Sequence, residues 1–191
     1  MRLTRLVSAA ILAMASVSAQ GADINVTGLA ITCNNCHGLH GVSAGGAMPS
    51  IGGQPAGYLK MVLKQYKDGS RYNTAMGRLV KGYTEEELAA LGDYYAKQPW
   101  VMAGEKADDA LVLKGKTLHG QKCLGCHGVK GEMAHDGMPR IAGQSAGFIA
   151  TELEKYLDPK FNMPGKVMEF AVKGLSAEDV KALAAFYASQ K

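Results

Sequence analysis

The chain has 191 residues, with 21 Lys and Arg against 17 Asp and Glu and a formal net charge of +4. This length suits one ordinary domain or two small ones. So small a charge excess argues against nucleic acid as a partner. Beyond residue 22, no apolar stretch reaches the roughly 20 residues that a membrane-spanning helix needs. We therefore expect no transmembrane segment in that part of the chain.

Residues 1–22 have the pattern of a secretory signal peptide. Arg2 and Arg5 give a positive start, residues 6–17 are apolar, and residues 17–19 (VSA) offer a small-residue cleavage site. The apolar run is shorter than the roughly 20 residues that span a bilayer, which argues against an uncleaved anchor. We predict export, with cleavage between about residue 19 and residue 22.

A short helix over residues 24–32 is expected to lead into the run CNNCH at 33–37, which returns as CLGCH at 123–127. C-x-x-C-H indicates covalent haem attachment, in which the two sulfurs add to porphyrin vinyl groups and the histidine binds iron from the proximal side. Two copies predict two covalently bound haem c groups. The predicted thioether residues are Cys33, Cys36, Cys123 and Cys126, and the predicted proximal ligands are His37 and His127.

Two other interpretations of paired cysteines fit less well. The two pairs are 90 residues apart, whereas a zinc ribbon has roughly 15–20 residues between its pairs. A thioredoxin-like site needs a βαβ context, and no alternating β-branched run flanks either motif. All four cysteines lie in the motifs, so none is left for a structural disulfide. Together with the signal peptide, this predicts a bacterial periplasmic location.

The sequence then repeats itself at the same spacing. A glycine-rich loop at 38–46 precedes MPSIGGQPAGY at 48–58, which returns as MPRIAGQSAGF at 138–148. The helix that follows each copy has apolar residues at i, i+3 and i+4. Such a self-match indicates duplication of a structural unit.

Each half closes with an amphipathic helix that begins with a capping signature, at Thr84 and at Ser176. Residues 99–108 are expected to link the halves, and a longer first helix is expected over 109–124. We predict an all-α fold of two tandem domains, 23–98 and 109–191. Each domain has about 80 residues, and the hydrophobic core of so small a domain gives only marginal stability without a cross-link or a cofactor. A bound haem would supply the missing apolar contacts.

The sixth iron ligand is not a histidine in our interpretation. His119 lies within two turns of the second motif, on the helix leading into it, and His40 and His135 align with Lys130 and Gly45 in the other half. We expect all three to be hydrogen-bonded core or solvent-exposed residues.

Methionine is the remaining candidate, because a thioether raises the reduction potential of iron. Met48 and Met138 lie only eleven residues past their histidines and are expected to be packing residues. Met76 and Met168 each lie eight residues before the capping residue of their half. We predict these two as distal ligands, with Met163 as the alternative to Met168.

These motifs resemble the two-haem class I cytochromes c, a family that includes cytochrome c4 and the cytochrome subunit of flavocytochrome c sulfide dehydrogenase. The runs at 76–84 (MGRLVKGYT), 94–99 (YYAKQP) and 117–119 (TLH) look most like the latter, whereas the repeated Pro, Ile and Gly-Gln pattern is shared more widely. The resemblance implies two domains related by a pseudo-twofold axis, with haems close enough for rapid electron transfer. It also implies a separate flavin-bearing partner that oxidises sulfide.

The predicted function is therefore electron transfer without catalysis, as the cytochrome subunit or partner of a periplasmic flavoprotein sulfide dehydrogenase. The chain has no G-x-G-x-x-G after a strand, so it is not itself the flavoprotein. One alternative is a free-standing shuttle similar to cytochrome c4 that delivers electrons to a terminal oxidase. Another is a dihaem enzyme such as a thiosulfate dehydrogenase, although no third cysteine is present in either half to act as a distal ligand.

Overall fold

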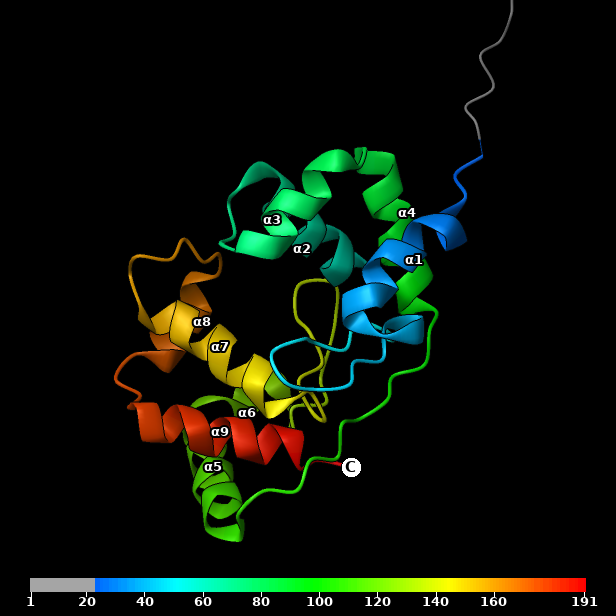
Figure 1. The fold of residues 1–191 in the computed structure, drawn as a ribbon. Helices are drawn as coiled ribbons and strands as arrows, with labels where there is room; N and C mark the ends of the chain where they lie inside the picture. The colour runs from blue at the N-terminus through cyan, green and yellow to red at the C-terminus, as the bar shows by residue number, and fades with distance from the viewer. Residues whose placement is uncertain (1–22) are drawn as a thin grey trace, which may run out of the picture.

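The computed structural model describes residues 23–191, which form helices and one isolated bridge, with no strand (Figure 1). The predicted signal peptide lies outside the described residues. Within residues 23–191, no helix is long and apolar enough to cross a membrane. The elements are α1 Val26–His37, η1 Leu39–Gly41, α2 Ala56–Asp68, α3 Thr74–Leu79, η2 Val80–Gly82, α4 Glu85–Ala96, α5 Asp109–Lys122, α6 Leu124–His127, α7 Ala146–Leu157, α8 Lys166–Val172 and α9 Ala177–Ala188. The expected all-α class is confirmed.

The helices form two groups, each around its own apolar core. In Figure 1, α1 to α4 occupy one half of the molecule and α5 to α9 the other, with the connecting segment running along one side. In the N-terminal half, α4 packs against α1 and α2, and in the C-terminal half α9 packs against α5 and α7. Separate clusters of buried residues lie inside the two halves. The domain boundaries at residues 98 and 109 remain predictions.

The two attachment motifs differ in local structure. The first continues the helix, so that α1 runs on to His37 instead of ending near residue 32. The second motif begins at Cys123, where α5 has ended, and its remaining residues form the single turn α6. Both stop at a glycine with positive φ, Gly38 at +76° and Gly128 at +77°. At Gly38 a Cβ atom would lie 1.9 Å from the Val42 carbonyl oxygen, so the chain can turn here only at glycine.

Both predicted capping boxes are present. The Thr84 N–H donates to Glu87 Oε2 at 2.7 Å, and the Glu87 N–H donates to Thr84 Oγ1 at 3.1 Å. The Ser176 N–H donates to Asp179 Oδ2 at 3.0 Å, and the Asp179 N–H donates to Ser176 Oγ at 3.2 Å. The apolar pattern of these two amphipathic helices predicts that Leu88, Leu91, Tyr94 and Tyr95 of α4 and Val180, Leu183, Phe186 and Tyr187 of α9 face inward. All of them are buried except Tyr94, which is half-buried.

The sequence repeat is also a repeat in space. The N–H of Ile51 donates to the Gly41 carbonyl at 2.8 Å, and the N–H of Ile141 donates to the Gly131 carbonyl at 2.9 Å. Both glycines have positive φ, and a Cβ on either would come within 2.9 Å of a tyrosine ring on the closing helix. The repeated loops are therefore held in the same way against α4 and α9.

Two glutamines join the halves reciprocally. Gln54 donates to the Arg140 carbonyl at 2.8 Å and accepts from the Arg140 N–H at 2.9 Å. Gln144 donates to the Ser50 carbonyl at 2.9 Å and accepts from the Ser50 N–H at 2.8 Å. Because each glutamine holds the backbone of the corresponding loop in the other half, the contact follows a pseudo-twofold axis. We call these four residues the glutamine clamp.

Candidate cofactor sites

The C-terminal half contains a cavity of about 530 Å³, within the range of about 300–1,000 Å³ that small-molecule and cofactor pockets occupy. Its walls include Cys123, Cys126 and His127 from the second motif and Met168 from α8. Apolar side chains from α7 and α9 complete much of the lining, among them Phe148, Ile149, Leu153, Leu183 and Tyr187. The structure therefore brings the predicted ligands of the second site together.

The histidine in this cavity is neutral, and one of its ring nitrogens has no partner among residues 23–191. His127 is buried, with 7 % of its surface exposed, and burial lowers its pKa, with a smaller contribution from His119. Its Nδ1 atom makes no hydrogen bond to the described residues. A neutral imidazole is the form that binds a metal.

His119 holds the second motif in place. Its Nε2 lies 2.7 Å from the Gly128 carbonyl oxygen and its Nδ1 lies 2.8 Å from the Tyr187 hydroxyl. A carbonyl only accepts, so Nε2 carries the proton and Nδ1 accepts from the tyrosine. Neither nitrogen is free, which confirms that His119 is a hydrogen-bonded core residue. The sequence did not predict that His119 holds the second motif. The run TLH at residues 117–119 was the feature that could have indicated this role.

In the N-terminal half, two of the four predicted site residues pack against the same apolar core. Cys33 and Met76 both pack against the apolar core of this half, while Cys36 is exposed. His37 is buried, burial lowers its pKa, and its Nδ1 lies 2.9 Å from the Pro49 carbonyl oxygen. That contact makes Nδ1 the protonated nitrogen and leaves the Nε2 lone pair for a metal.

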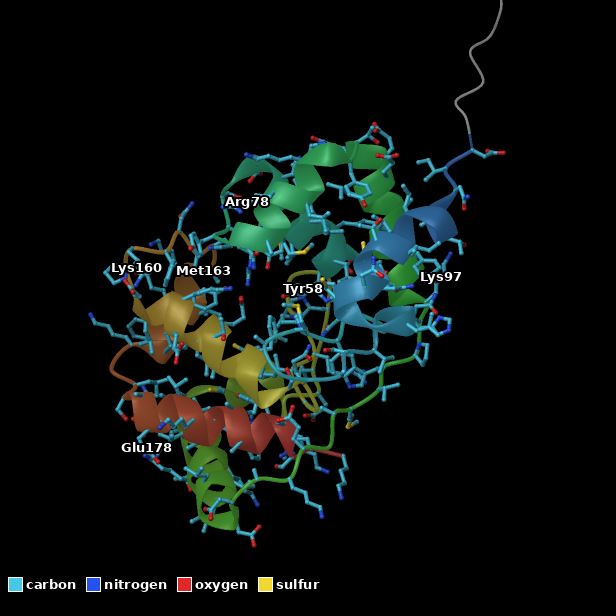
Figure 2. All side chains as sticks on the ribbon, in the orientation of Figure 1. Tyr58, Arg78, Lys97, Lys160, Met163 and Glu178 are labelled. Atoms are coloured by element: carbon cyan, nitrogen blue, oxygen red, sulfur yellow. The ribbon has the colours of Figure 1, made fainter. Side chains whose placement is uncertain are left out.

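The predicted distal residues lie on short helices that precede the closing helices. Met76 is in α3, which begins where Asn73 Oδ1 accepts from the Met76 N–H at 2.7 Å. Met168 is in α8 and lines the cavity, whereas Met163 lies in the loop before α8 and is not among the lining residues. Figure 2 labels Met163 on this loop.

The methionines and histidines that we did not predict as ligands agree with the sequence predictions of their burial in all but one case. Met138 lines the cavity, but Met48 is 42 % exposed, so its expected packing role is wrong. The reason is that the loop around Met48 lies at the surface of the N-terminal half. His40 and His135 are exposed, as expected, although His135 lies at the rim of the cavity.

The N-terminal half also contributes to the cavity of the C-terminal half. Tyr58, Met61, Gln65 and Arg71, from α2 and the segment after it, line its wall. Figure 2 shows Tyr58 near the centre of the molecule, between the two groups of helices. Nothing in the sequence predicted these residues, because only the packing of the two halves brings them to the site.

These features fit covalently attached haem. All four cysteines are free. The C-terminal cavity has two cysteines, a neutral histidine and a thioether on a largely apolar wall, which is the donor set of a c-type site. Three residues that line the cavity, Gln65, Arg71 and His127, each have a buried polar atom with no partner within residues 23–191. The fold and the sites thus define a protein of the c-type cytochrome class.

Comparison with known proteins agrees. The family described as "Cytochrome c" matches residues 112–191. Cytochrome c4 of Pseudomonas aeruginosa is 31 % identical over 168 residues, which cover 82 % of this chain and 83 % of that protein. The crystal structure of reduced cytochrome c4 from Pseudomonas stutzeri aligns with a TM-score of 0.78 and 25 % identity, over 87 % of this chain and 97 % of that one.

Some of the relatives are named for sulfur chemistry. The thiosulfate dehydrogenase electron acceptor of Stutzerimonas stutzeri is 28 % identical over 199 residues, or 96 % of this chain and 92 % of that protein. The cytochrome subunit of sulfide dehydrogenase of Chlorobaculum tepidum is 42 % identical over 67 residues, or 35 % of this chain and 60 % of that protein. This chain belongs to the cytochrome c family, in its two-haem branch related to cytochrome c4. It carries two covalently bound haem c groups and transfers electrons.

Proposed function

We propose that this chain takes electrons from a periplasmic dehydrogenase that oxidises an inorganic sulfur compound and passes them on through its two haems. One haem is attached to Cys33 and Cys36 and the other to Cys123 and Cys126. The iron ligands are His37 with Met76, and His127 with Met168.

The observation that carries this proposal is the pairing of His127 and Met168 in one cavity. A bound haem supplies reversible one-electron chemistry at its iron. The His127 ring nitrogen and the Met168 thioether would both bind that iron, which would leave no position on it for a substrate. The chain is then a carrier and not a catalyst, and the sulfur compound is oxidised on the partner.

A flavoprotein sulfide dehydrogenase is the donor that we propose first. Support comes from the resemblance of residues 76–84 and 94–99 to its cytochrome subunit and from the match to the Chlorobaculum tepidum protein. The second candidate is a free-standing shuttle. It is supported by the cytochrome c4 and thiosulfate dehydrogenase acceptor relatives, which match over most of both chains.

Reduction kinetics of the purified holoprotein would test the donor. A sulfide-oxidising flavoprotein that co-purifies with this chain and reduces both haems when sulfide is added supports the subunit proposal. Isolation as a lone cytochrome that a terminal oxidase oxidises rapidly, with no reduction by flavoprotein and sulfide, supports the shuttle. Reduction by a thiosulfate dehydrogenase with thiosulfate, and not by the flavoprotein with sulfide, would identify a different sulfur donor.

Export and haem content have a separate test. Intact-mass measurement of the chain from a periplasmic extract should show a start between about residues 20 and 23 and the added mass of two haems. A full-length chain retained in the cytoplasm would contradict the export proposal.

A further inference from the structure

The interface between the halves contains a buried charged cluster. Arg71, between α2 and α3, donates from Nη2 to Glu152 Oε2 of α7 at 2.8 Å, and Lys155 lies 2.6 Å from the other carboxylate oxygen. The three side chains are only 8 %, 13 % and 12 % exposed. Two cations therefore share one carboxylate, and a formal charge of +1 is left within the interface. A buried net charge favours an additional anion beside it.

The cluster also has unused hydrogen-bonding capacity toward the cavity of the C-terminal half. The Arg71 Nε donor has no acceptor within residues 23–191, and Arg71 lines that cavity. Such a buried donor without an acceptor is costly and marks a position for a ligand atom. The segment is held in this place, because the Tyr72 N–H donates to the Asn162 carbonyl of the other half at 2.7 Å.

We propose that Arg71 of the N-terminal half binds a propionate carboxylate of the haem attached to the C-terminal half. The inference rests on the proposed placement of that haem in the cavity. A propionate is the anionic end of an otherwise apolar group, and a guanidinium offers it a planar set of donors. Tyr58 and Tyr156 also line the cavity, and burial raises the pKa of each, so their hydroxyls stay protonated and can donate.

This contact exists for one haem only. Aligned on the attachment motifs, which are 90 residues apart, position 71 corresponds to Phe161. Aligned on the capping residues Thr84 and Ser176, it corresponds to Met163. Glu152 likewise corresponds to Val62. The second haem site is thus completed by the other domain, through residues that the duplication did not copy. Arg71 is then a cofactor-binding residue that also joins the halves.

The test compares the midpoint potentials of the two haems in the holoprotein. Removing a nearby positive charge stabilises ferric haem, so Arg71→Gln should lower the reduced-to-oxidised ratio of the second haem by about tenfold at a fixed ambient potential. Glu152→Gln removes a negative charge at the same place and should raise that ratio. The first haem should change little in both variants. Lys97→Gln, an exposed charge away from the interface (Figure 2), is the matched control and should leave both potentials unchanged.

A direct readout of the propionate completes the test. Infrared difference spectra with ¹³C-labelled haem carboxylates should show one carboxylate band that shifts in Arg71→Gln. If Arg71→Gln does not fold, Arg71→Lys keeps the charge but not the planar fork and should shift the same band with a smaller change in potential. An ion pair that does not touch the propionate predicts an unchanged carboxylate band in Arg71→Gln, and that result overturns the inference.

The inference and the proposed haem placement fail in different ways. The two haems are assigned from Met76→Ala and Met168→Ala, each of which should alter one haem spectrum. If neither does so, the proposed ligands are wrong. If both do so and Arg71→Gln shifts the first haem instead of the second, the ligands stand and the role of Arg71 is overturned.

Discussion

Met163 and Met168 are five residues apart, yet only Met168 lines the cavity with His127. We predict that Met168→Ala removes about half of the methionine-to-ferric-iron charge-transfer absorption, since one of two thioether ligands is lost. The same variant should bind carbon monoxide at one reduced haem. Absorption spectra in both oxidation states measure both effects.

Met163→Ala is the matched control for this prediction, because it removes a thioether only five residues away, from the loop before α8. It should keep the full charge-transfer absorption and bind no carbon monoxide. The reverse pattern in the two variants would identify Met163 as the ligand and show that aligning the halves on their capping residues was wrong.

Asp179 gives a pH-dependent contribution to stability. Its carboxylate accepts from the Ser176 N–H and lies 2.9 Å from Lys114 Nζ, and these contacts lower its pKa to about 2. Because the folded pKa lies below the unfolded value, the contribution is present above about pH 4 and is lost as pH falls through about 2. Asp179→Asn should therefore lower the thermal unfolding midpoint at about pH 5, and the difference from the parent protein should shrink toward about pH 2.

Glu178→Gln removes a carboxylate from the same first turn and is the comparison for Asp179→Asn. It makes no hydrogen bond or ion pair to the described residues and should lower the midpoint less. Equal effects from the two variants, at both pH values, would show that the contacts of Asp179 add nothing beyond a charge near the helix terminus.

At the scale of elements, the two capping boxes start the helices that close each half. We predict that Thr84→Ala and Ser176→Ala each reduce the free energy of unfolding by about 1 kcal/mol, because each loses the acceptor for an N3 N–H. Thr84→Ser keeps the oxygen and should cost little. Denaturant titration of the holoprotein measures the loss, and an Ala variant as stable as the Ser variant would show that the box is dispensable.

At the scale of the whole molecule, the glutamine clamp decides how firmly the halves are joined. Gln54 and Gln144 are each 3 % exposed. Replacing either with Met leaves a backbone N–H and a carbonyl of the other half unpaired, which should cost about 1–3 kcal/mol of interface stability. Faster proteolysis within residues 97–108 and a less cooperative unfolding transition would report the loosening.

Two comparisons complete that experiment. Gln98→Ala removes a glutamine that donates only to Tyr94 of its own half, and it should not affect the interface. The double variant Gln54→Met with Gln144→Met should cost less than the sum of the single changes, since both contacts depend on the same docking. Additive effects would show that the two contacts act independently.

The sequence by itself determined the elements whose signals are local. The C-x-x-C-H runs carry their own chemistry, and the capping boxes involve residues three positions apart. The apolar faces of α4 and α9 follow from helical periodicity. The repeat of 90 residues predicted two similar halves, because a duplicated pattern of loops and helices folds in the same way twice.

Only the tertiary structure decided how the two halves meet. The glutamine clamp pairs residues 86 or 94 positions apart, and the ion pair of Arg71 with Glu152 spans 81. Neither contact has a sequence signature, since a buried glutamine or arginine looks like an exposed one until packing removes water from around it. The position of Met168 combines both kinds of information: its spacing before Ser176 suggested it over Met163, but only the fold shows that it lines the same cavity as His127.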